Sequence, residues 1–194
     1  RLLFQGKKVV GVEWSRNNTL KSSFARREVI VCGGAFSSPH LLLRSGIGPA
    51  QHLRDMGVEI VHDLPGVGEN LQDHFGIGLE FESTVKSTVN DLYNNKIKGG
   101  LQLLRYLLFR TGPFADNGNY SNTFIHTSPQ IPTPDMMVTF MAWYTSEDLR
   151  PHPFSGFTIL AEHMRPQSRG NVRLKGPDAR TDPAIQFNFF GSEA

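Results

Sequence analysis

The apolar positions of the first 32 residues come in short runs that are separated by turn residues. Residues 1–14 predict two strands joined by a turn at Gly6, and Asn17 and Asn18 favour a second turn because both tolerate left-handed backbone conformations. A polar segment then leads into the apolar run of residues 29–32, which predicts a buried strand. The pattern therefore indicates a small antiparallel meander that feeds one buried strand.

The next apolar positions have the spacing of short helices. Ser38 is a good N-cap and Pro39 suits the first helical position, where a missing N–H costs nothing. Ser45 and Gly46 are expected to end this helix after about two turns. A second short helix is predicted over residues 49–56, where Pro49 can begin it.

After these helices the pattern of apolar and polar residues changes. Residues 58–65 predict a short strand, and the glycine-rich residues 66–78 predict a loop. Residues 98–110 predict the longest helix, which carries a leucine stripe. Four segments that alternate in polarity follow, without helices between them, and predict an antiparallel sheet: residues 120–127, 135–144, 154–164 and 170–175. We expect the end of an α/β domain in residues 1–78 and the first part of an α+β domain in residues 79–194.

Composition narrows the possible partners. The net charge is +2, from 20 basic and 18 acidic residues without a basic run, which argues against nucleic acid. The longest apolar run, around residues 101–109, is far shorter than the ~20 residues that span a bilayer. Cys32 is the single cysteine, so an intrachain disulfide and a cysteine-based zinc cluster are excluded. Because Cys32 ends an apolar run, we expect it to be a buried small hydrophobe.

Two glycines lie between the predicted strand and the first helix. Gly33 and Gly34 would let backbone amides at a helix start approach an anionic or polar ligand. An ordinary strand-to-helix turn that needs glycine only for packing fits the pattern equally well. Residues 66–71 come near a dinucleotide-binding pattern, but Leu71 replaces the third glycine and Pro65 precedes the first. We therefore do not interpret that segment as a phosphate loop.

The histidines do not form a recognisable metal or acid–base motif. All seven are scattered singly, without the spacings of common zinc sites, so a metal site is not expected. Asp73 precedes His74, and a carboxylate can tune a histidine pKa, but neighbours in an extended chain face apart. Asn70, Asp73 and His74 are better explained as residues that tie down a loop by hydrogen bonds.

Four segments resemble one enzyme family in order and spacing. The segment GGAFSSPHLLLRSGIGP, residues 33–49, resembles the second signature of the glucose–methanol–choline (GMC) flavin oxidoreductases. The resemblance extends through LPGVGENLQDH, LLFRTGPFADNGNYSNTFIHT and MRPQSRGNVRLKGPDARTDPAIQFNFF, which begin at residues 64, 107 and 164. Together these matches cover most of the chain, and they are most similar to the choline dehydrogenase and alcohol dehydrogenase branch.

The resemblance implies a fold and a chemistry. Residues 1–78 would be part of a Rossmann-like FAD-binding α/β domain, and residues 79–194 part of an α+β substrate domain with an antiparallel sheet. The family oxidises a primary alcohol or choline-like substrate to the aldehyde by hydride transfer to the flavin. Oxygen, a quinone or another acceptor then takes the electrons. Because fold does not fix function, a cyanohydrin lyase on the same fold and a non-catalytic interaction module are the alternatives.

The resemblance also carries over individual residues. It implies that the following eight lie at the cofactor, in a backbone turn, a helix start and a loop: Gly33, Gly34, Ala35, Ser38, Pro39, Asn70, Asp73 and His74. It places the family's GxGxxG loop before Arg1 and its catalytic histidine pair beyond Ala194. We therefore assign no catalytic residue and no metal ligand in this sequence, and we expect the chain to be a central piece of a longer protein.

Overall fold

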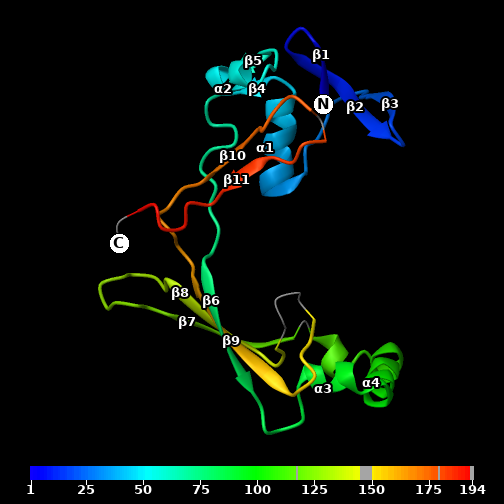
Figure 1. The fold of residues 1–194 in the computed structure, drawn as a ribbon, viewed down its shortest axis with the longest axis vertical. Helices are drawn as coiled ribbons and strands as arrows, with labels where there is room; N and C mark the ends of the chain where they lie inside the picture. Colours follow the sequence, from blue (N-terminus) through cyan, green and yellow to red (C-terminus); the bar gives the residue numbers. More distant parts are fainter. Residues whose placement is uncertain (117, 145–149, 179, 193–194) are drawn as a thin grey trace. The chain divides into compact units, whose positions relative to one another are not determined.

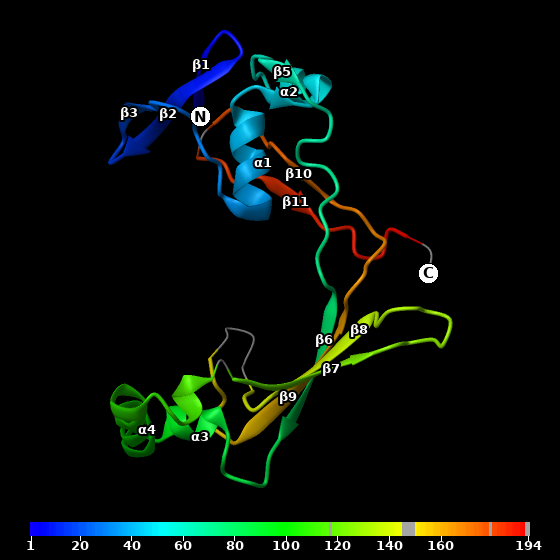
Figure 2. The ribbon, with the colours of Figure 1, turned by 180° about the vertical axis from the view of Figure 1, so that it is seen from behind.

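The computed structural model describes residues 1–194 except 117, 145–149, 179 and 193–194. The chain forms two compact units, labelled by element in Figure 1 and seen from behind in Figure 2. The first unit contains residues 1–73 and 167–194, and the second contains residues 74–166. Residues 167–194, which we predicted with the second domain, thus pack with the first part of the chain.

The first unit opens with the predicted antiparallel meander. Its strands, in the order β1-β2-β3, are β1 (Leu2–Gln5), β2 (Lys8–Arg16) and β3 (Thr19–Phe24). The backbone has positive φ at Gly6 and at Asn17 and Asn18, which are the residues that the sequence indicated for the two turns.

The predicted buried strand over residues 29–32 is wrong. This segment has no regular structure, Ile30 is 75% exposed and Cys32 is exposed rather than buried. A strand must pair its backbone N–H and C=O groups, and none of the described strands lies beside these residues to do so. The apolar pattern alone could not reveal the missing neighbour.

The first helix, α1 (Gly34–Arg44), begins earlier than predicted. Gly33 is its N-cap, and Pro39 lies inside the helix rather than at its first position. The Ser38 hydroxyl oxygen accepts a hydrogen bond from the Gly33 N–H at 2.9 Å. Ser38 therefore satisfies a backbone N–H group at the start of the helix without being the N-cap. The predicted end is confirmed, because Ser45 is the C-cap and Gly46 follows with φ +83°.

The remaining elements of the first unit are short. They are β4 (Ile47–Gly48), α2 (Ala50–Asp55), β5 (His62–Asp63), β10 (Asn171–Arg173) and β11 (Ala184–Gln186). Strands β4 and β5 pair in parallel, and β10 and β11 pair antiparallel. The buried side chains of Leu43, Leu53, Val67 and Leu174 form the core that joins the two helices to the loop after β5 and to the end of β10. Each such leucine stabilises the fold by about 1.5–3 kcal/mol.

The second unit contains an antiparallel sheet that includes three of the four predicted segments, whereas the fourth, residues 170–175, forms β10 of the first unit. Its strands run in the order β6-β9-β8-β7: β6 (Gly76–Glu82), β7 (Asn119–Ile125), β8 (Met136–Met141) and β9 (Gly156–His163). The pattern had assigned the start of β6 to a glycine-rich loop. Gly76 and Gly78 are instead sheet residues. A Cβ on Gly76 would press on the Glu162 side chain of the neighbouring strand, whereas a Cβ on Gly78 would meet Thr158 at an ordinary contact distance of 3.4 Å.

Among the described residues, three helical segments lie between β6 and β7 along the chain. They are α3 (Val89–Asn94), the predicted long helix α4 (Lys96–Phe109) and the 3₁₀ turn η1 (Pro113–Ala115). Helix α3 was not predicted, although Thr88 and Asp91 form a capping box at its start. In the part of the chain that the structure describes, no helix combines the length and the apolar character needed to cross a bilayer.

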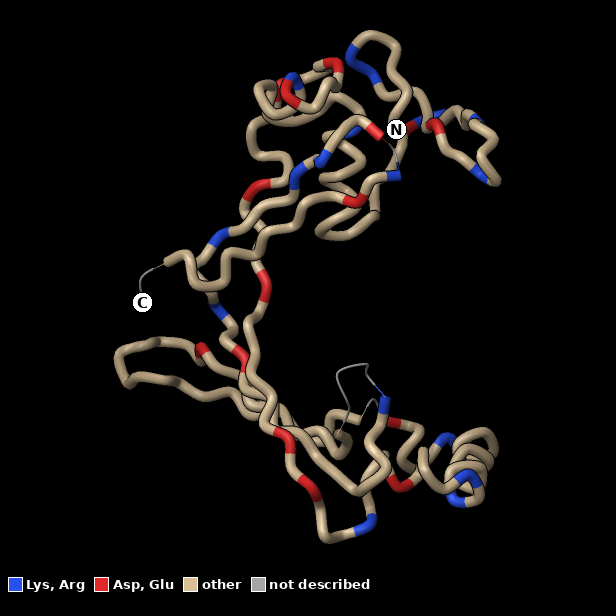
Figure 3. Tube along the Cα trace, in the orientation of Figure 1, with Lys and Arg blue, Asp and Glu red and all other residues tan. Residues whose placement is uncertain are grey.

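Charges of both signs are spread along both units. Figure 3 shows basic and acidic residues interspersed on the chain trace, without a continuous stripe of one sign. This distribution agrees with the nearly balanced composition of 20 basic and 18 acidic residues.

Candidate functional site

Three segments of the first unit surround a cavity of about 330 Å³. Its walls come from α1, from the loop at residues 68–72 and from β10, and the lining residues are Ala35, Pro39, Gly68, Glu69, Asn70, Leu71, Gln72 and Val172. Three residues that the resemblance assigned to the cofactor, Ala35, Pro39 and Asn70, therefore lie in the wall of one cavity although two segments supply them.

The glycine turn lies immediately before the α1 wall. Gly33 and Gly34 are exposed, and Gly34 has φ +75°, a conformation that glycine adopts without strain. A Cβ built on Gly34 would meet nothing within 4 Å, so its backbone faces open space that a ligand can approach closely. Ser38 does not line the cavity, and its hydroxyl group is engaged by Gly33.

The opposite wall is a loop that is fastened to β10. Gly68 has φ +79°, and a Cβ on it would lie 2.2 Å from the Val172 carbonyl oxygen. The Val172 N–H donates to the Gly68 carbonyl oxygen at 2.7 Å, and Leu71 and Gly170 exchange backbone hydrogen bonds of 3.0 and 2.8 Å. Asn70 lies between these anchor points with φ +61°, a left-handed conformation that asparagine tolerates.

Charged and titratable side chains contact this loop and the end of β10. Arg173 donates from Nη1 to the Val67 carbonyl oxygen at 3.5 Å and forms an ion pair with Glu69. The Leu174 N–H donates to His52 Nε2 at 3.0 Å, which requires that nitrogen to be unprotonated. Burial lowers the pKa of His52, the Arg173 charge lowers it further, and Asp55 opposes both effects.

Two predicted residues lie apart from the cavity. Asp73 and His74 do not line it; Asp73 is the last residue of the first unit's opening segment, and His74 begins the second unit. Their assignment to the cofactor stays a prediction.

Sequence reasoning missed most of the loop wall. Gly68, Glu69, Leu71, Gln72 and Val172 line the cavity but were not assigned to the site. The signal available was the glycine pattern of residues 66–71, which we examined only as a phosphate loop. The structure explains the positive-φ glycine differently, because Gly68 allows the loop to lie directly on β10.

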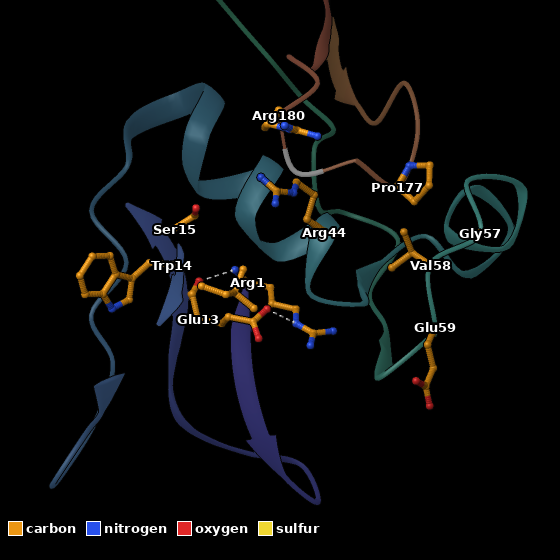
Figure 4. Close-up of a pocket in the computed structure, with 11 residues that line it drawn as sticks. Arg1, Glu13, Trp14, Ser15, Arg44, Gly57, Val58, Glu59, Pro177 and Arg180 are labelled. Atoms are coloured by element: carbon orange, nitrogen blue, oxygen red, sulfur yellow. Dashed lines mark hydrogen bonds and ion pairs between the residues drawn. The ribbon is translucent and has the colours of Figure 1, made fainter. Parts of the chain in front are cut away.

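A second cavity in the first unit, of about 660 Å³, is drawn in Figure 4. Charged residues of both signs line it: Arg1, Glu13, Arg44, Glu59 and Arg180. Arg1 Nε lies 2.8 Å from Glu13 Oε1, and Arg180 Nε lies 3.5 Å from an Asp178 oxygen. Because this cavity contains none of the eight residues implied by the resemblance, we do not assign it to the cofactor.

His126 and His152 each interact with different residues of the second unit. His126 Nδ1 lies 2.8 Å from the Ile131 carbonyl oxygen, and the His152 ring stacks on Tyr144 and Phe154 at centroid distances of 4.3 and 4.9 Å. Among the described residues, no group of three or more His, Cys, Asp or Glu side chains is arranged to hold a metal ion. Glu69 is the one titratable residue among those described as lining the cavity.

Comparison with known proteins identifies the family. A family model described as GMC oxidoreductase matches residues 1–76. Residues 1–76 belong to the GMC oxidoreductase family. The chain is 36% identical over 200 residues to the oxygen-dependent choline dehydrogenase of Stenotrophomonas maltophilia (strain K279a), covering 100% of this chain and 34% of that protein. It is 37% identical over 196 residues to the enzyme of the same name from Brucella ovis, covering 100% and 35%. The chain thus spans about a third of the length of these relatives.

Solved structures share the fold. A formate oxidase matches 99% of this chain, and 39% of its own chain is covered, with a TM-score of 0.87 and 24% identity. Pyridoxine 4-oxidase from Mesorbium loti matches 98% of the chain, with 34% of that protein covered, at a TM-score of 0.72 and 26% identity. The mixture of helices and antiparallel sheets is thus shared with segments of these two oxidases, while the Rossmann-like detail of residues 1–78 stays a prediction.

Proposed function

We propose that this chain is the central part of an FAD-dependent oxidoreductase that oxidises a primary alcohol or choline-like substrate to the aldehyde. The family match over residues 1–76 and the relatives named oxygen-dependent choline dehydrogenase support this proposal. Residues 1–78 would belong to the FAD-binding domain, and residues 79–194 to the substrate domain.

One observation carries the proposal beyond resemblance. Ala35 and Pro39 of α1 and Asn70 of the loop, which the resemblance implies for the cofactor, lie around the same cavity. The exposed Gly33 and Gly34 extend that wall with backbone that has no side chain, and the space beyond Gly34 is open. A planar, polar cofactor fits such a wall because backbone groups can approach it closely.

The residues of this chain would bind and orient the cofactor. Bound FAD supplies the hydride acceptor of the reaction. The turn at Gly33–Ala35 and the start of α1 would hold one side of the cofactor, and the loop around Asn70 would hold the other. Ser38 would act through the turn that it stabilises. Asp73 and His74 complete the proposed set, in which no residue of this chain acts as the catalytic base.

The experiment uses the purified full-length protein. Bound flavin is expected to absorb at about 450 nm because of its conjugated ring system. Anaerobic addition of choline, and separately of simple primary alcohols, should bleach this band with formation of the aldehyde. A folded protein that stays colourless and inactive after FAD is added would overturn the proposal. Release of aldehyde from a cyanohydrin without bleaching would identify the lyase instead.

The electron acceptor can be resolved with the same preparation. Oxygen consumption during alcohol turnover identifies oxygen as the acceptor, whereas turnover that depends on an added quinone identifies a dehydrogenase that uses a quinone.

A further inference from the structure

Strand β10 and the loop of residues 66–72 are joined by backbone hydrogen bonds along one wall of the cavity. Val172 donates to the Gly68 carbonyl oxygen at 2.7 Å, and Leu71 and Gly170 bond to each other through both their backbone groups. Because Val172 is 1% exposed and itself lines the cavity, β10 is a buried support against which the loop rests. The position of the loop therefore depends on contacts from a segment about a hundred residues later in the chain.

Arg173 of β10 contacts the loop on both sides of Gly68, at Val67 and at Glu69. Its Nη1 donates to the carbonyl oxygen of Val67, and its Nη2 forms an ion pair with the carboxylate of Glu69. The Arg173 and Glu69 side chains are 26% and 42% exposed, so solvent partly screens the pair. A planar guanidinium can make both contacts at once, and the single ammonium group of lysine matches this fork geometry poorly.

The two residues held by Arg173 lead directly into the cavity wall. Glu69 lines the cavity, and Asn70 follows it in a left-handed conformation. Arg173 does not line the cavity itself, so its effect on a ligand must pass through Glu69 and the adjacent backbone. Without the guanidinium, the loop would keep its backbone bonds to Val172 but lose the contacts that fix its direction at residues 67–69.

We propose that Arg173 is a positioning residue for the cofactor, which sets the loop carrying Asn70 through its contacts with Val67 and Glu69. This inference rests on the proposed function, because it takes FAD as the occupant of the cavity. It predicts that the Arg173 side chain tunes both the affinity for FAD and the environment of the bound flavin.

The test compares four single variants and one double variant of the full-length protein. Arg173→Ala removes both contacts, Arg173→Lys keeps the charge but not the fork, and Glu69→Gln removes the ion pair. Arg180→Ala is the matched control, because Arg180 is an 80% exposed arginine of the same unit that does not line the cavity. Each protein is stripped of flavin and titrated with FAD by fluorescence, and the visible circular dichroism of the bound flavin is recorded.

We expect Arg173→Ala to weaken FAD binding about tenfold, since loss of a charged hydrogen-bond donor has a cost of that order. Arg173→Lys should restore part of this loss, and the flavin circular dichroism should change in Arg173→Ala but not in Arg180→Ala. In the double variant Arg173→Ala with Glu69→Gln, the loss should be smaller than the product of the single losses, because the residues act as a pair.

Each outcome separates this inference from the proposed function. If the wild-type protein binds no FAD, the proposed function fails. If it binds FAD and all Arg173 variants match it in affinity and circular dichroism, only the positioning role fails. An equal effect of Arg180→Ala would also overturn the role. If Arg173→Ala does not fold, Arg173→Lys and Glu69→Gln decide the question by the same two measurements.

Discussion

His52 holds the end of β10 only while its Nε2 is unprotonated. That nitrogen accepts a hydrogen bond from the Leu174 N–H at 3.0 Å, and Leu174 belongs to the buried core of the first unit. Burial and the nearby Arg173 lower the pKa of His52, so the folded protein binds a proton less readily than the unfolded chain. The cavity wall is thus coupled to the ionisation of a residue that does not line it.

The sign of the resulting pH dependence follows from this lowered pKa. The stabilising effect is fully present above the ordinary histidine value of 6.5 and is lost as the pH falls from there toward the folded-state pKa. The melting temperature of the full-length protein should therefore fall between pH 7 and pH 5, roughly the range in which histidine titrates.

The matched variant is His52→Gln, which keeps a side-chain acceptor for Leu174 but does not titrate. Its melting temperature should depend less on pH than that of the wild type. Some dependence should remain, because burial and Arg44 also lower the pKa of His40 against the opposing effect of Asp182. Equal slopes for the variant and the wild type would contradict the role of His52.

Among individual residues, local backbone chemistry could be predicted and long-range environment could not. The glycine and asparagine residues of the meander turns have the expected positive φ values, because these conformations depend on the residue itself. Cys32 is exposed against expectation because its burial depends on neighbours far away in the sequence. Arg173 gave no signal at all, since its contacts with Val67 and Glu69 exist only after β10 has met the loop.

Among the elements, helix α3 depends on interactions at its first turn. Asp91 accepts hydrogen bonds from the Thr88 N–H at 2.9 Å and from the Thr88 hydroxyl at 3.0 Å, and its other oxygen accepts from Ser155 at 2.6 Å. Burial tends to raise the pKa of Asp91, but the hydrogen bonds from Ser155 and Thr88 outweigh it and lower the pKa. The carboxylate therefore joins α3 to the segment before β9.

Asp91→Ala should destabilise the protein by about 1–2 kcal/mol, because it removes a helix cap and leaves the Ser155 hydroxyl without this acceptor. The measurement is urea unfolding of the full-length protein, followed by circular dichroism. Thr88→Ser is the matched control, since it keeps the hydroxyl group in the capping box, and it should cost less than Asp91→Ala. If both variants unfold at the wild-type midpoint, the cap does not stabilise α3.

The elements that could be predicted carry their signal locally. Helix α4 and strands β7 to β9 follow regular apolar periodicities, and all were found within a few residues of their bounds. The capping box of α3 was also present in the sequence, but its single short turn lacks a periodic stripe. Strand β6 was not predicted because of its two glycines, of which Gly76 is explained by the Glu162 side chain of the neighbouring strand.

At the scale of the whole molecule, the chain leaves much apolar surface uncovered. Leu101, Leu104 and Leu108 of α4 are 62%, 51% and 65% exposed, and Ile77 and Leu79 of β6 are 59% and 57% exposed. Soluble proteins seldom expose contiguous apolar surface without a partner for it. The first unit is not continuous in sequence, because residues 167–194 return to pack with residues 1–73. That return depends on the pairing of Val172 with Gly68 and of Gly170 with Leu71.

We predict that the 194-residue chain expressed alone binds a hydrophobic dye strongly and melts without a sharp transition. The reason is that exposed leucines on α4 and exposed residues on β6 contribute little to burial, which is the main stabilising term in folding. Dye fluorescence and a calorimetric scan measure the two properties, with the full-length protein as the reference. Replacing Leu101 and Leu108 by glutamine should reduce dye binding by the isolated chain. The control substitution Gln102→Ala, on the same helix, removes no apolar side chain and should not reduce dye binding. A soluble monomer of the isolated chain with a sharp, cooperative melt and little dye binding would contradict the prediction, because these surfaces would then need no further cover.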